Sequence, residues 1–309
     1  MNLDKKVATR QSYGEALAKL GDENEKVVVL DADLSKTTKT EIFAKQFPER
    51  FYDVGIAEQN LMGVAAGMAT SGFIPYVSTF AVFACGRAYD QVRNSIAYPK
   101  LNVKICATHA GVTAGEDGAT HQMIEDLSMM RTLPNMTVLS TSDDIQTKWA
   151  IKEISKIEGP VYLRLARLAT PIIYDENEKF EIGKGYQFGN GTVATVIATG
   201  VVVSEALKAQ EELRKQGIDV RVIDMHTIKP IDKEIIIKAA KETKKIITIE
   251  DHNIIGGLGT AVCEVLTEEY PIKVTRMGIK DTFGTSGKGE ELMKYFNITA
   301  EDIIKEVNQ

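Results

Sequence analysis

Short runs of β-branched and other apolar residues alternate with longer amphipathic stretches along most of the chain. A run such as Val27-Val28-Val29-Leu30 is apolar without interruption, which is typical of a strand buried on both faces of a parallel sheet. The stretches between the runs are long enough for the crossover helices that parallel strands require. The pattern predicts an α/β fold with strands at 26–30, 51–54, 76–78, 103–108, 137–139, 161–165, 193–198, 220–223, 246–249 and 274–277. The expected helices span 13–21, 38–47, 58–71, 80–97, 143–157, 204–216, 233–242 and 257–268.

The alternation breaks at about 168–191. This segment holds the charged run 175–179 and several glycines but no apolar periodicity, as is common at a domain boundary. A chain of 309 residues is also long enough for two domains. We expect a first α/β domain at 1–170, a linker at 171–191 and a smaller α/β domain at 192–309.

Composition and charge exclude several classes of protein. The formal net charge is −6, so we expect no nucleic-acid partner. The three cysteines lie far apart and form no C-x-x-C pair, which fits a reducing compartment. The N-terminus lacks the apolar core of a signal peptide, and the longest nearly apolar stretch, 193–203, is about half the length of a membrane span. These features predict a cytoplasmic protein with no membrane partner.

Two segments partly resemble known ligand-binding motifs but depart from them at key positions, and the histidines match no metal-binding motif. Gly256-Gly257-Leu258-Gly259 resembles a dinucleotide fingerprint, but Val262 replaces the last glycine, and close helix–sheet packing explains the glycines better. The segment 284–289 imitates the end of a phosphate loop but lacks its first glycine and the Ser or Thr after the lysine. The four histidines have no zinc-ligand spacing, so no metal site is expected.

Two segments of the first domain carry candidate functional side chains. Glu58 falls where a short strand passes into the helix expected at 58–71; taken alone, it is explained better as a first-turn acid favoured by the helix dipole. Phe80 and Phe83 are three residues apart at a strand-to-helix turn, a spacing that lets them flank a flat ring. Two ordinary core phenylalanines are the alternative.

A third segment, from His109 to Gln122, combines three glycines, two acids and two histidines. It follows a predicted strand, and α/β sheets bind ligands at the carboxyl ends of their strands. His109 and His121 are candidates to donate hydrogen bonds to substrate oxygens, while Asp117 is a candidate to accept one from a hydroxyl. A structural loop that happens to contain two histidines is the alternative.

Taken together, these segments resemble the C-terminal half of a transketolase, a thiamine-diphosphate enzyme. The similarity spans nearly the whole chain, and its most specific part is Gly-Glu-Asp-Gly-x-Thr-His-Gln at 115–122, downstream of the Glu58 segment. The other matching segments are 8–10, 31–35, 53–60, 80–91, 227–230, 250–252 and 256–259. The resemblance implies a pyrimidine-binding domain with a central parallel sheet, followed by a smaller transketolase C-terminal α/β domain.

The resemblance also implies roles for individual residues. Glu58 matches the catalytic glutamate that contacts N1′ of the cofactor's aminopyrimidine ring, where a carboxyl group favours the tautomer whose 4′-nitrogen can take the C2 proton. The implied cofactor-binding residues are Asp33, Glu58, Phe80 and Phe83, and Gly86 stands where some relatives have a third aromatic. The implied substrate-binding residues are Arg10, Thr37, His109, Asp117, His121 and Arg167. Arg10, Thr37 and Arg167 match positions near the terminal phosphate of a sugar, although Arg164 lies close to Arg167.

One half of such a site has no counterpart in this sequence. Full-length relatives carry an N-terminal domain whose Gly-Asp-Gly motif holds magnesium and the diphosphate, and no Gly-Asp-Gly occurs here. The resemblance therefore implies the C-terminal subunit of a split transketolase, which moves a two-carbon ketol unit from a ketose phosphate to an aldose phosphate. A separate N-terminal subunit would bind Mg²⁺ and the diphosphate, in a dimer of heterodimers. The second domain is expected to serve dimer packing.

Three alternatives stay open. The β subunit of a 2-oxoacid dehydrogenase E1 component shares the two-domain plan and a similar glutamate, but its substrate has a carboxylate and no polyol chain for the 115–122 loop to bind. A synthase that joins pyruvate to a triose phosphate is usually one long chain with both halves. A non-catalytic assembly subunit has no need to keep Glu58, the two phenylalanines and Asp117 together. Whether the sugar ends in a phosphate or a sulfonate is also open.

Overall fold

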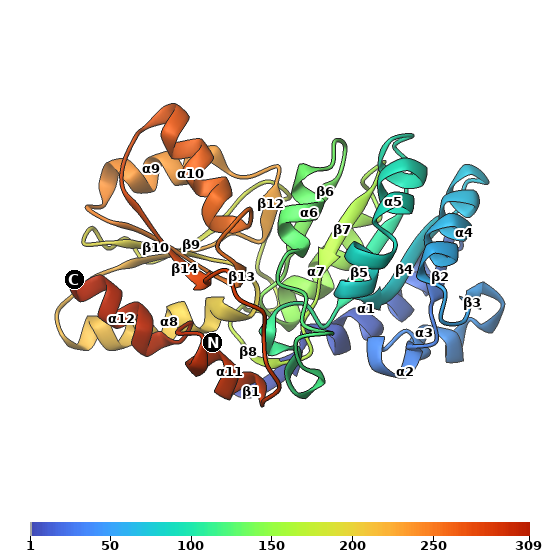
Figure 1. The fold of residues 1–309 in the computed structure, drawn as a ribbon, viewed down its shortest axis with the longest axis horizontal. Helices are drawn as coiled ribbons and strands as arrows, with labels where there is room; N and C mark the ends of the chain where they lie inside the picture. Colours follow the sequence, from blue (N-terminus) through green and yellow to red (C-terminus); the bar gives the residue numbers. More distant parts are fainter. Residues whose placement is uncertain (1) are drawn as a thin grey trace.

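The computed structural model describes residues 2–309 and contains two α/β domains side by side along its long axis (Figure 1). The predicted α/β fold class with two domains is confirmed. None of the helices in the described part of the chain is long and apolar enough to span a bilayer.

The first domain is built on a seven-stranded sheet in the order β12-β6-β7-β5-β4-β2-β3. Its strands run parallel except β12, which comes from the second half of the chain. The strands are β2 (Val27–Asp31), β3 (Phe51–Asp53), β4 (Ile74–Phe80), β5 (Lys104–Thr108), β6 (Thr137–Ser140), β7 (Val161–Arg164) and β12 (Thr227–Lys229). The helices are α1 (Thr9–Glu23), α2 (Ser35–Thr38), α3 (Glu41–Gln46), α4 (Glu58–Thr70), α5 (Tyr89–Gln91), α6 (Asp126–Thr132) and α7 (Asp144–Ile154).

Helices cover both faces of this sheet, and β2 shows why its sequence is apolar throughout. Val28 and Leu30 enter one core together with residues of α4, whereas Val27 and Val29 enter another with residues of α1 and α7. All four side chains are almost completely buried. Successive residues of a strand point to opposite faces, so a strand covered on both sides needs apolar residues at every position.

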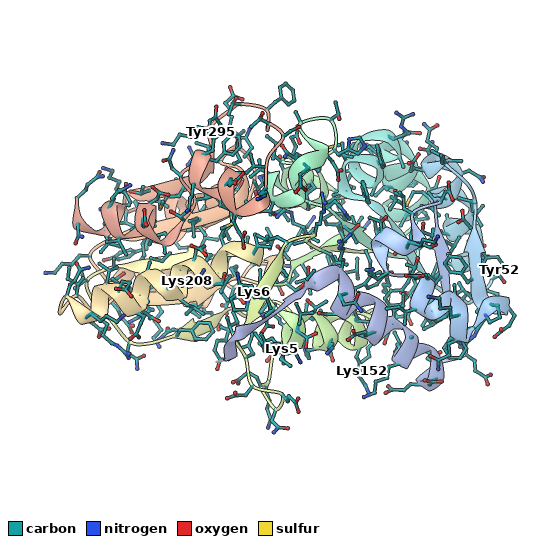
Figure 2. All side chains as sticks on the ribbon, turned by 90° about the horizontal axis from the view of Figure 1, so that it is seen from below. Lys5, Lys6, Tyr52, Lys152, Lys208 and Tyr295 are labelled. Atoms are coloured by element: carbon teal, nitrogen blue, oxygen red, sulfur yellow. The ribbon has the colours of Figure 1, made fainter. Side chains whose placement is uncertain are left out.

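The second domain is a five-stranded sheet in the order β14-β13-β10-β11-β9, parallel except for the edge strand β9. Its strands are β9 (Tyr186–Phe188), β10 (Thr195–Ala198), β11 (Arg221–Asp224), β13 (Ile246–Asn253) and β14 (Val274–Ile279). Its helices are α8 (Val203–Lys215), α9 (Lys233–Glu242), α10 (Leu258–Glu269), α11 (Gly289–Tyr295) and α12 (Ala300–Asn308). Charged side chains such as Lys152 and Lys208 extend from the surface of both domains (Figure 2).

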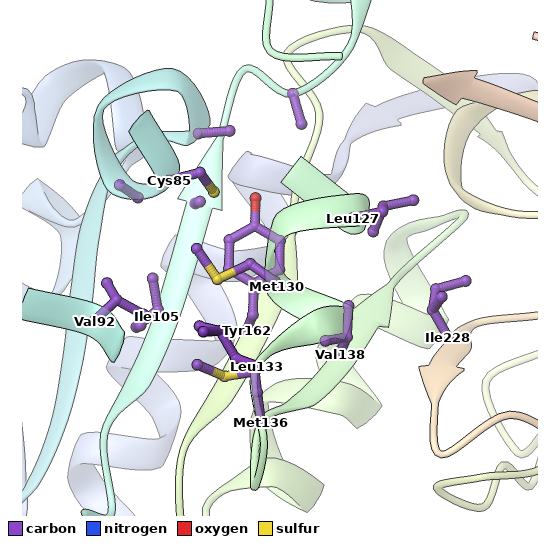
Figure 3. Packing of buried hydrophobic residues seen from close by; sticks show 14 of the residues in the cluster. Cys85, Val92, Ile105, Leu127, Met130, Leu133, Met136, Val138, Tyr162 and Ile228 are labelled. Carbon is purple, nitrogen blue, oxygen red and sulfur yellow. The ribbon is translucent and has the colours of Figure 1, made fainter. Parts of the chain in front are cut away.

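The two domains share part of their core. Thr227 of β12 pairs with Leu139 of β6, so the second half of the chain completes the edge of the first sheet. Ile228 belongs to the same buried cluster as Met130 and Val138 (Figure 3). The position of the second domain is therefore fixed by a strand pairing and by buried apolar contacts.

Each expected strand forms, with ends that differ by a few residues, but four further strands were not predicted: β12, described above, and three others. β1 (Asn2–Ala8) and β8 (Ala169–Ile172) pair with each other in a separate two-stranded sheet. β9 lies inside the expected linker at 171–191 and pairs with β11. These strands are short or rich in polar residues, so they lack the apolar pattern on which the prediction relied. The expected domain boundaries stay a proposal.

The helix expected at 80–97 is wrong at its start and in its form. Phe80 is the last residue of β4, and the helical segment that follows contains two π-helical stretches, Phe83–Arg87 and Val92–Ala97. The sequence analysis expected one helix at 38–47 where the structure has α2 and α3, and it predicted no helix at α6, α11 or α12. π-Helical turns widen a helix locally and are frequent at functional sites.

Candidate active site

The ten candidate residues meet at one edge of the first sheet, where the parallel strands have their carboxyl ends. They line two neighbouring clefts. The first, the Glu58 cleft, has a volume of about 660 Å³, and its candidate residues are Asp33, Glu58 and Phe83. The second, the Arg10 cleft, has a volume of about 440 Å³, and its candidate residues are Arg10, Thr37, Phe80, His109, Asp117, His121 and Arg167. All but Arg10, which lies at the start of α1, end or follow β2, β3, β4, β5 or β7.

Glu58 is a buried acid at the start of α4. Its side chain is only 4% exposed, and its carboxyl group has no hydrogen-bond or ion-pair partner within residues 2–309. Because Glu58 lines the cleft and no neighbouring side chain engages its carboxyl group, that group is available to a ligand or to another chain. This position in a cleft favours a functional role for Glu58 over that of a first-turn acid that serves only the helix dipole. Asp33 also lines this cleft, at a backbone φ of 60°.

Two aromatic rings stand between the clefts. Phe80 and Phe83 stack with their ring centroids 5.9 Å apart and their planes at 8°. Phe80 also stacks on His109 at 3.9 Å, and His121 packs edge-on against both phenylalanines. Phe83 is only half-buried and lines the Glu58 cleft, so the pair is more than core packing. A Cβ at Gly86 would meet no atom within 4 Å, so a larger side chain has room at this exposed position.

His109 is held by neighbours on both ring nitrogens. Arg10 Nη1 lies 3.3 Å from His109 Nε2, and because a guanidinium group can only donate, Nε2 accepts. The ring proton is then on Nδ1, which donates to Thr108 Oγ1 at 2.9 Å. Burial, together with the charges of Arg10 and Arg167, lowers the pKa of His109 to about 3, so the ring is neutral at pH 7. In this geometry His109 accepts from Arg10, which differs from the expected donor role. Arg10 also donates to the carbonyl oxygen of Thr37 at 2.9 Å.

Arg167, rather than Arg164, faces the Arg10 cleft. Arg167 Nη1 lies 3.3 Å from Asp117 Oδ2, and Nη2 lies 3.1 Å from Glu116 Oε2. Arg164 is 5% exposed, and its Nε donates to Asp126 Oδ2 at 2.7 Å inside the protein. Arg164 is therefore structural, and Asp117 enters the cleft already paired with a cation.

Two lysines that the sequence analysis missed also line the Arg10 cleft. Lys36 and Lys39 lie on either side of Thr37, in the turn after β2. Their position next to a candidate residue is the only signal in the sequence that points to them. The turn is held by Asp31, which is buried and accepts from the backbone N–H of Leu34 at 2.7 Å.

The second domain holds the glycine-rich loop in place, a role that the sequence analysis also missed. The buried carboxylate of Asp251 accepts from the backbone N–H groups of Val112 and Thr113 at 2.9 and 3.3 Å and from Thr113 Oγ1 at 2.6 Å. Gln122 Nε2 donates to the carbonyl oxygen of Thr285 at 2.9 Å. Both ends of the 109–122 loop are thus tied to residues far away in the sequence.

The glycines at 256–259 are explained by an internal carboxylate. Glu250 accepts from the backbone N–H groups of Leu258 and Gly259, at 2.7 and 2.8 Å, where a dinucleotide phosphate would otherwise bind. A Cβ at Gly257 would lie 2.0 Å from Glu250 Oε2, so only glycine fits. Close packing of α10 on the sheet, the explanation that the sequence analysis preferred, applies to Gly259, where a Cβ would lie 2.8 Å from Thr248 Oγ1 of β13.

Residues 2–309 contain no cluster of three His, Cys, Asp or Glu side chains that could hold a metal ion. The two clefts in the described part of the chain offer a nearly buried carboxyl group, stacked aromatic rings and an excess of positive charge.

Comparison with known proteins gives consistent matches. Residues 5–172 match the pyrimidine-binding domain of transketolase, and residues 183–303 match the transketolase C-terminal domain. A putative transketolase C-terminal section of Methanocaldococcus jannaschii is 53% identical over 96% of this chain and 94% of that protein. A 6-deoxy-6-sulfo-D-fructose transketolase subunit of a Clostridium species is 41% identical over 97% of this chain and 93% of that protein.

Human transketolase is 40% identical over 98% of this chain but only 49% of its own length, so the chain spans about half of that relative. A solved structure described as a split-gene transketolase in an inactive β4 tetramer is 53% identical, with a TM-score of 0.91 over 98% of this chain and 97% of that one.

Proposed function

The chain belongs to the transketolase family, and from this premise we propose that it is the C-terminal subunit of a two-chain transketolase. In this proposal it transfers a two-carbon ketol unit from a ketose phosphate to an aldose phosphate, and it is active only with an N-terminal subunit. Two relatives that match it over nearly their whole length are named as a C-terminal section and as a subunit, which supports the two-chain arrangement.

The observation that carries the proposal is the unpaired, buried Glu58 beside Phe83 in one cleft. This combination fits the aminopyrimidine ring of thiamine diphosphate, the cofactor on which the transketolase family depends. Glu58 would hydrogen-bond to the ring, Phe80 and Phe83 would pack against it, and Asp33 lines the same cleft. When bound, the cofactor supplies the carbon nucleophile that attacks the ketose carbonyl and stores the electron pair of the broken C–C bond.

The Arg10 cleft is proposed to bind the sugar. His121 offers a ring nitrogen near the two phenylalanines, and Asp117 offers a carboxylate oxygen to a hydroxyl group. Arg10, Thr37 and Arg167 would hold the terminal phosphate, which fits their place in the same cleft. His109 would act mainly by orienting Arg10, since its Nε2 accepts from that side chain.

The N-terminal subunit is proposed to supply what residues 2–309 lack. Magnesium binds oxygen ligands together with the diphosphate, and the described residues contain no cluster suited to it. Self-association into a dimer of heterodimers completes the proposal; the similar split-gene chain forms an inactive β4 tetramer by itself. A cytoplasmic location is proposed from the separate, reduced cysteines.

A substrate panel tests the proposal against its alternatives. The chain is mixed with an N-terminal transketolase subunit, thiamine diphosphate and Mg²⁺, and is offered either a ketose phosphate with an aldose phosphate or pyruvate. Ketol transfer between sugars is expected. Pyruvate decarboxylation would favour an E1 β subunit, condensation of pyruvate with a triose phosphate would favour a synthase, and no turnover with any donor would favour a non-catalytic subunit.

A further inference from the structure

The Arg10 cleft contains more positive charge than its acids neutralise. Its charged lining residues, apart from the histidines, are Arg10, Lys36, Lys39, Asp117 and Arg167. Asp117 and the neighbouring Glu116 are both paired with Arg167, at 3.3 and 3.1 Å. Arg10 and the two lysines have no ion pair within residues 2–309. Together with Arg167 these groups make four cations against the two carboxylates of Asp117 and Glu116, so the residues that the structure describes leave an excess of two positive charges at this cleft.

The acid that follows the two lysines in the chain is engaged elsewhere. Glu41 accepts from Lys45 Nζ at 2.9 Å on the surface of α3. The hydrogen bond from Lys45 is also the main reason why the pKa of Glu41 is lowered, with Lys39 and Lys36 contributing less. The lysines of the cleft are thus not neutralised by their own segment.

The turn that carries the two lysines is held by the buried carboxylate of Asp31. Asp31, completely buried at the end of β2, accepts from Thr38 Oγ1 at 2.7 Å and from Thr40 Oγ1 at 2.8 Å. Lys39 has a backbone φ of 74°, and its carbonyl oxygen lies so close to α1 that a Cβ at Gly14 would be 2.4 Å from it. The backbone on both sides of Thr37 is therefore fixed. The side chains of Lys36 and Lys39 extend from this fixed backbone beside the cleft.

We propose that Lys36 and Lys39 make this site selective for sugars whose terminal group is a dianion. The proposal rests on the proposed function and adds two specificity-determining residues to it. A phosphate monoester carries about −1.5 to −2 charges at pH 7, whereas a sulfonate carries a single charge. Because Coulomb attraction scales with the charge of the ligand, uncompensated cations favour the phosphate over the sulfonate, and both over a neutral end.

The test compares three donors on the reconstituted two-chain complex: a ketose 6-phosphate, the corresponding 6-deoxy-6-sulfonate and the unsubstituted ketose. In the double variant Lys36→Gln/Lys39→Gln, kcat/KM for the phosphate is expected to fall roughly tenfold, mostly through KM. It should fall roughly threefold for the sulfonate, and should be unchanged for the neutral ketose. The variant Lys36→Arg/Lys39→Arg, which keeps both charges, should restore the preference for the phosphate.

Lys45→Gln is the matched control, because Lys45 is exposed on the neighbouring helix and pairs with Glu41 outside the cleft. It should leave all three values of kcat/KM unchanged. An equal loss for the three donors in the double variant would overturn the proposal, since it would indicate a structural role. An unchanged phosphate-to-sulfonate ratio would overturn it as well.

A binding measurement separates this proposal from the proposed function. Calorimetric titration of the ketose 6-phosphate into the complex carrying Glu58→Gln does not depend on turnover. Removal of both lysines should raise Kd roughly tenfold in that background, and an equal Kd would refute the lysine proposal. Absence of ketol transfer by the wild-type complex would refute the proposed function, while the titration would still decide the role of the lysines.

Discussion

Asp251 is the residue through which the second domain acts on the candidate site, and Asp251→Asn tests that connection. The carboxylate is 1% exposed and accepts three hydrogen bonds from Val112 and Thr113, the first residues of the segment that leads to Asp117. In the wild type both carboxylate oxygens accept hydrogen bonds. The amide of the Asp251→Asn variant would replace one of these oxygens with an NH₂ group, which cannot accept. At least one buried donor is then left unpaired, at a cost of about 1–3 kcal/mol.

We therefore expect Asp251→Asn to lower the free energy of unfolding by about 1–3 kcal/mol and to raise KM for the ketose donor, because the loop carrying Asp117 loses its anchor. The affinity for the cofactor should not change, since Asp251 does not line the Glu58 cleft. Urea unfolding of the chain and donor kinetics of the reconstituted complex are the two measurements. Asp219→Asn, at an exposed aspartate of the same domain, is the control. A urea midpoint and a KM equal to those of the wild type would refute this account of the domain contact.

Three further predictions concern single residues. Glu58→Gln should keep the fold but lower turnover by ~10²–10⁴-fold, because an amide cannot exchange a proton with the cofactor ring; more than about a tenth of wild-type turnover would contradict the assignment of Glu58. Asp117→Ala should cost ~1–3 kcal/mol in donor kcat/KM with little change in cofactor affinity; a sharp loss of cofactor binding with normal sugar kinetics would move Asp117 to the other cleft. Lys104 is buried at the start of β5, and burial lowers its pKa from 10.5 to about 7. Between these values the unfolded chain holds a proton that the folded chain has released, so the stability of the wild type relative to Lys104→Met should rise from pH 7 to pH 10; a constant difference in urea midpoints would contradict the lowered pKa.

The sequence could predict those parts of the fold that rest on local apolar patterns. β2, with two helix-covered faces, has an unbroken apolar run, and its prediction needed no further information. β12 could not be predicted in the same way, because its three residues become a strand only through pairing with β6, which lies far away in the sequence. The π-helical turns after Phe80 likewise depend on packing, and no residue pattern marks them.

The candidate site follows the same division. Residues that a sequence motif identifies, such as Glu58 and Asp117, line the two clefts. Residues that act through distant contacts escaped the sequence analysis: Asp251 reaches its loop over 138 sequence positions, and Lys36 and Lys39 only become cleft residues once the turn after β2 folds over Asp31. The pairing of His109 Nε2 with Arg10 could not be foreseen either, because the two residues lie 99 positions apart in the sequence and meet only in the folded chain.

The central claim is that this chain contributes the pyrimidine side of a cofactor site whose diphosphate side lies on another chain. Calorimetric titration with thiamine diphosphate and Mg²⁺ tests it most directly, on the isolated chain, on the N-terminal subunit and on their mixture. We predict weak binding or none by the isolated chain, because its described residues hold no cluster for the metal, and tight, Mg²⁺-dependent binding only by the mixture. Tight, Mg²⁺-dependent binding by the isolated chain, together with sugar turnover in the absence of a partner, would contradict the claim.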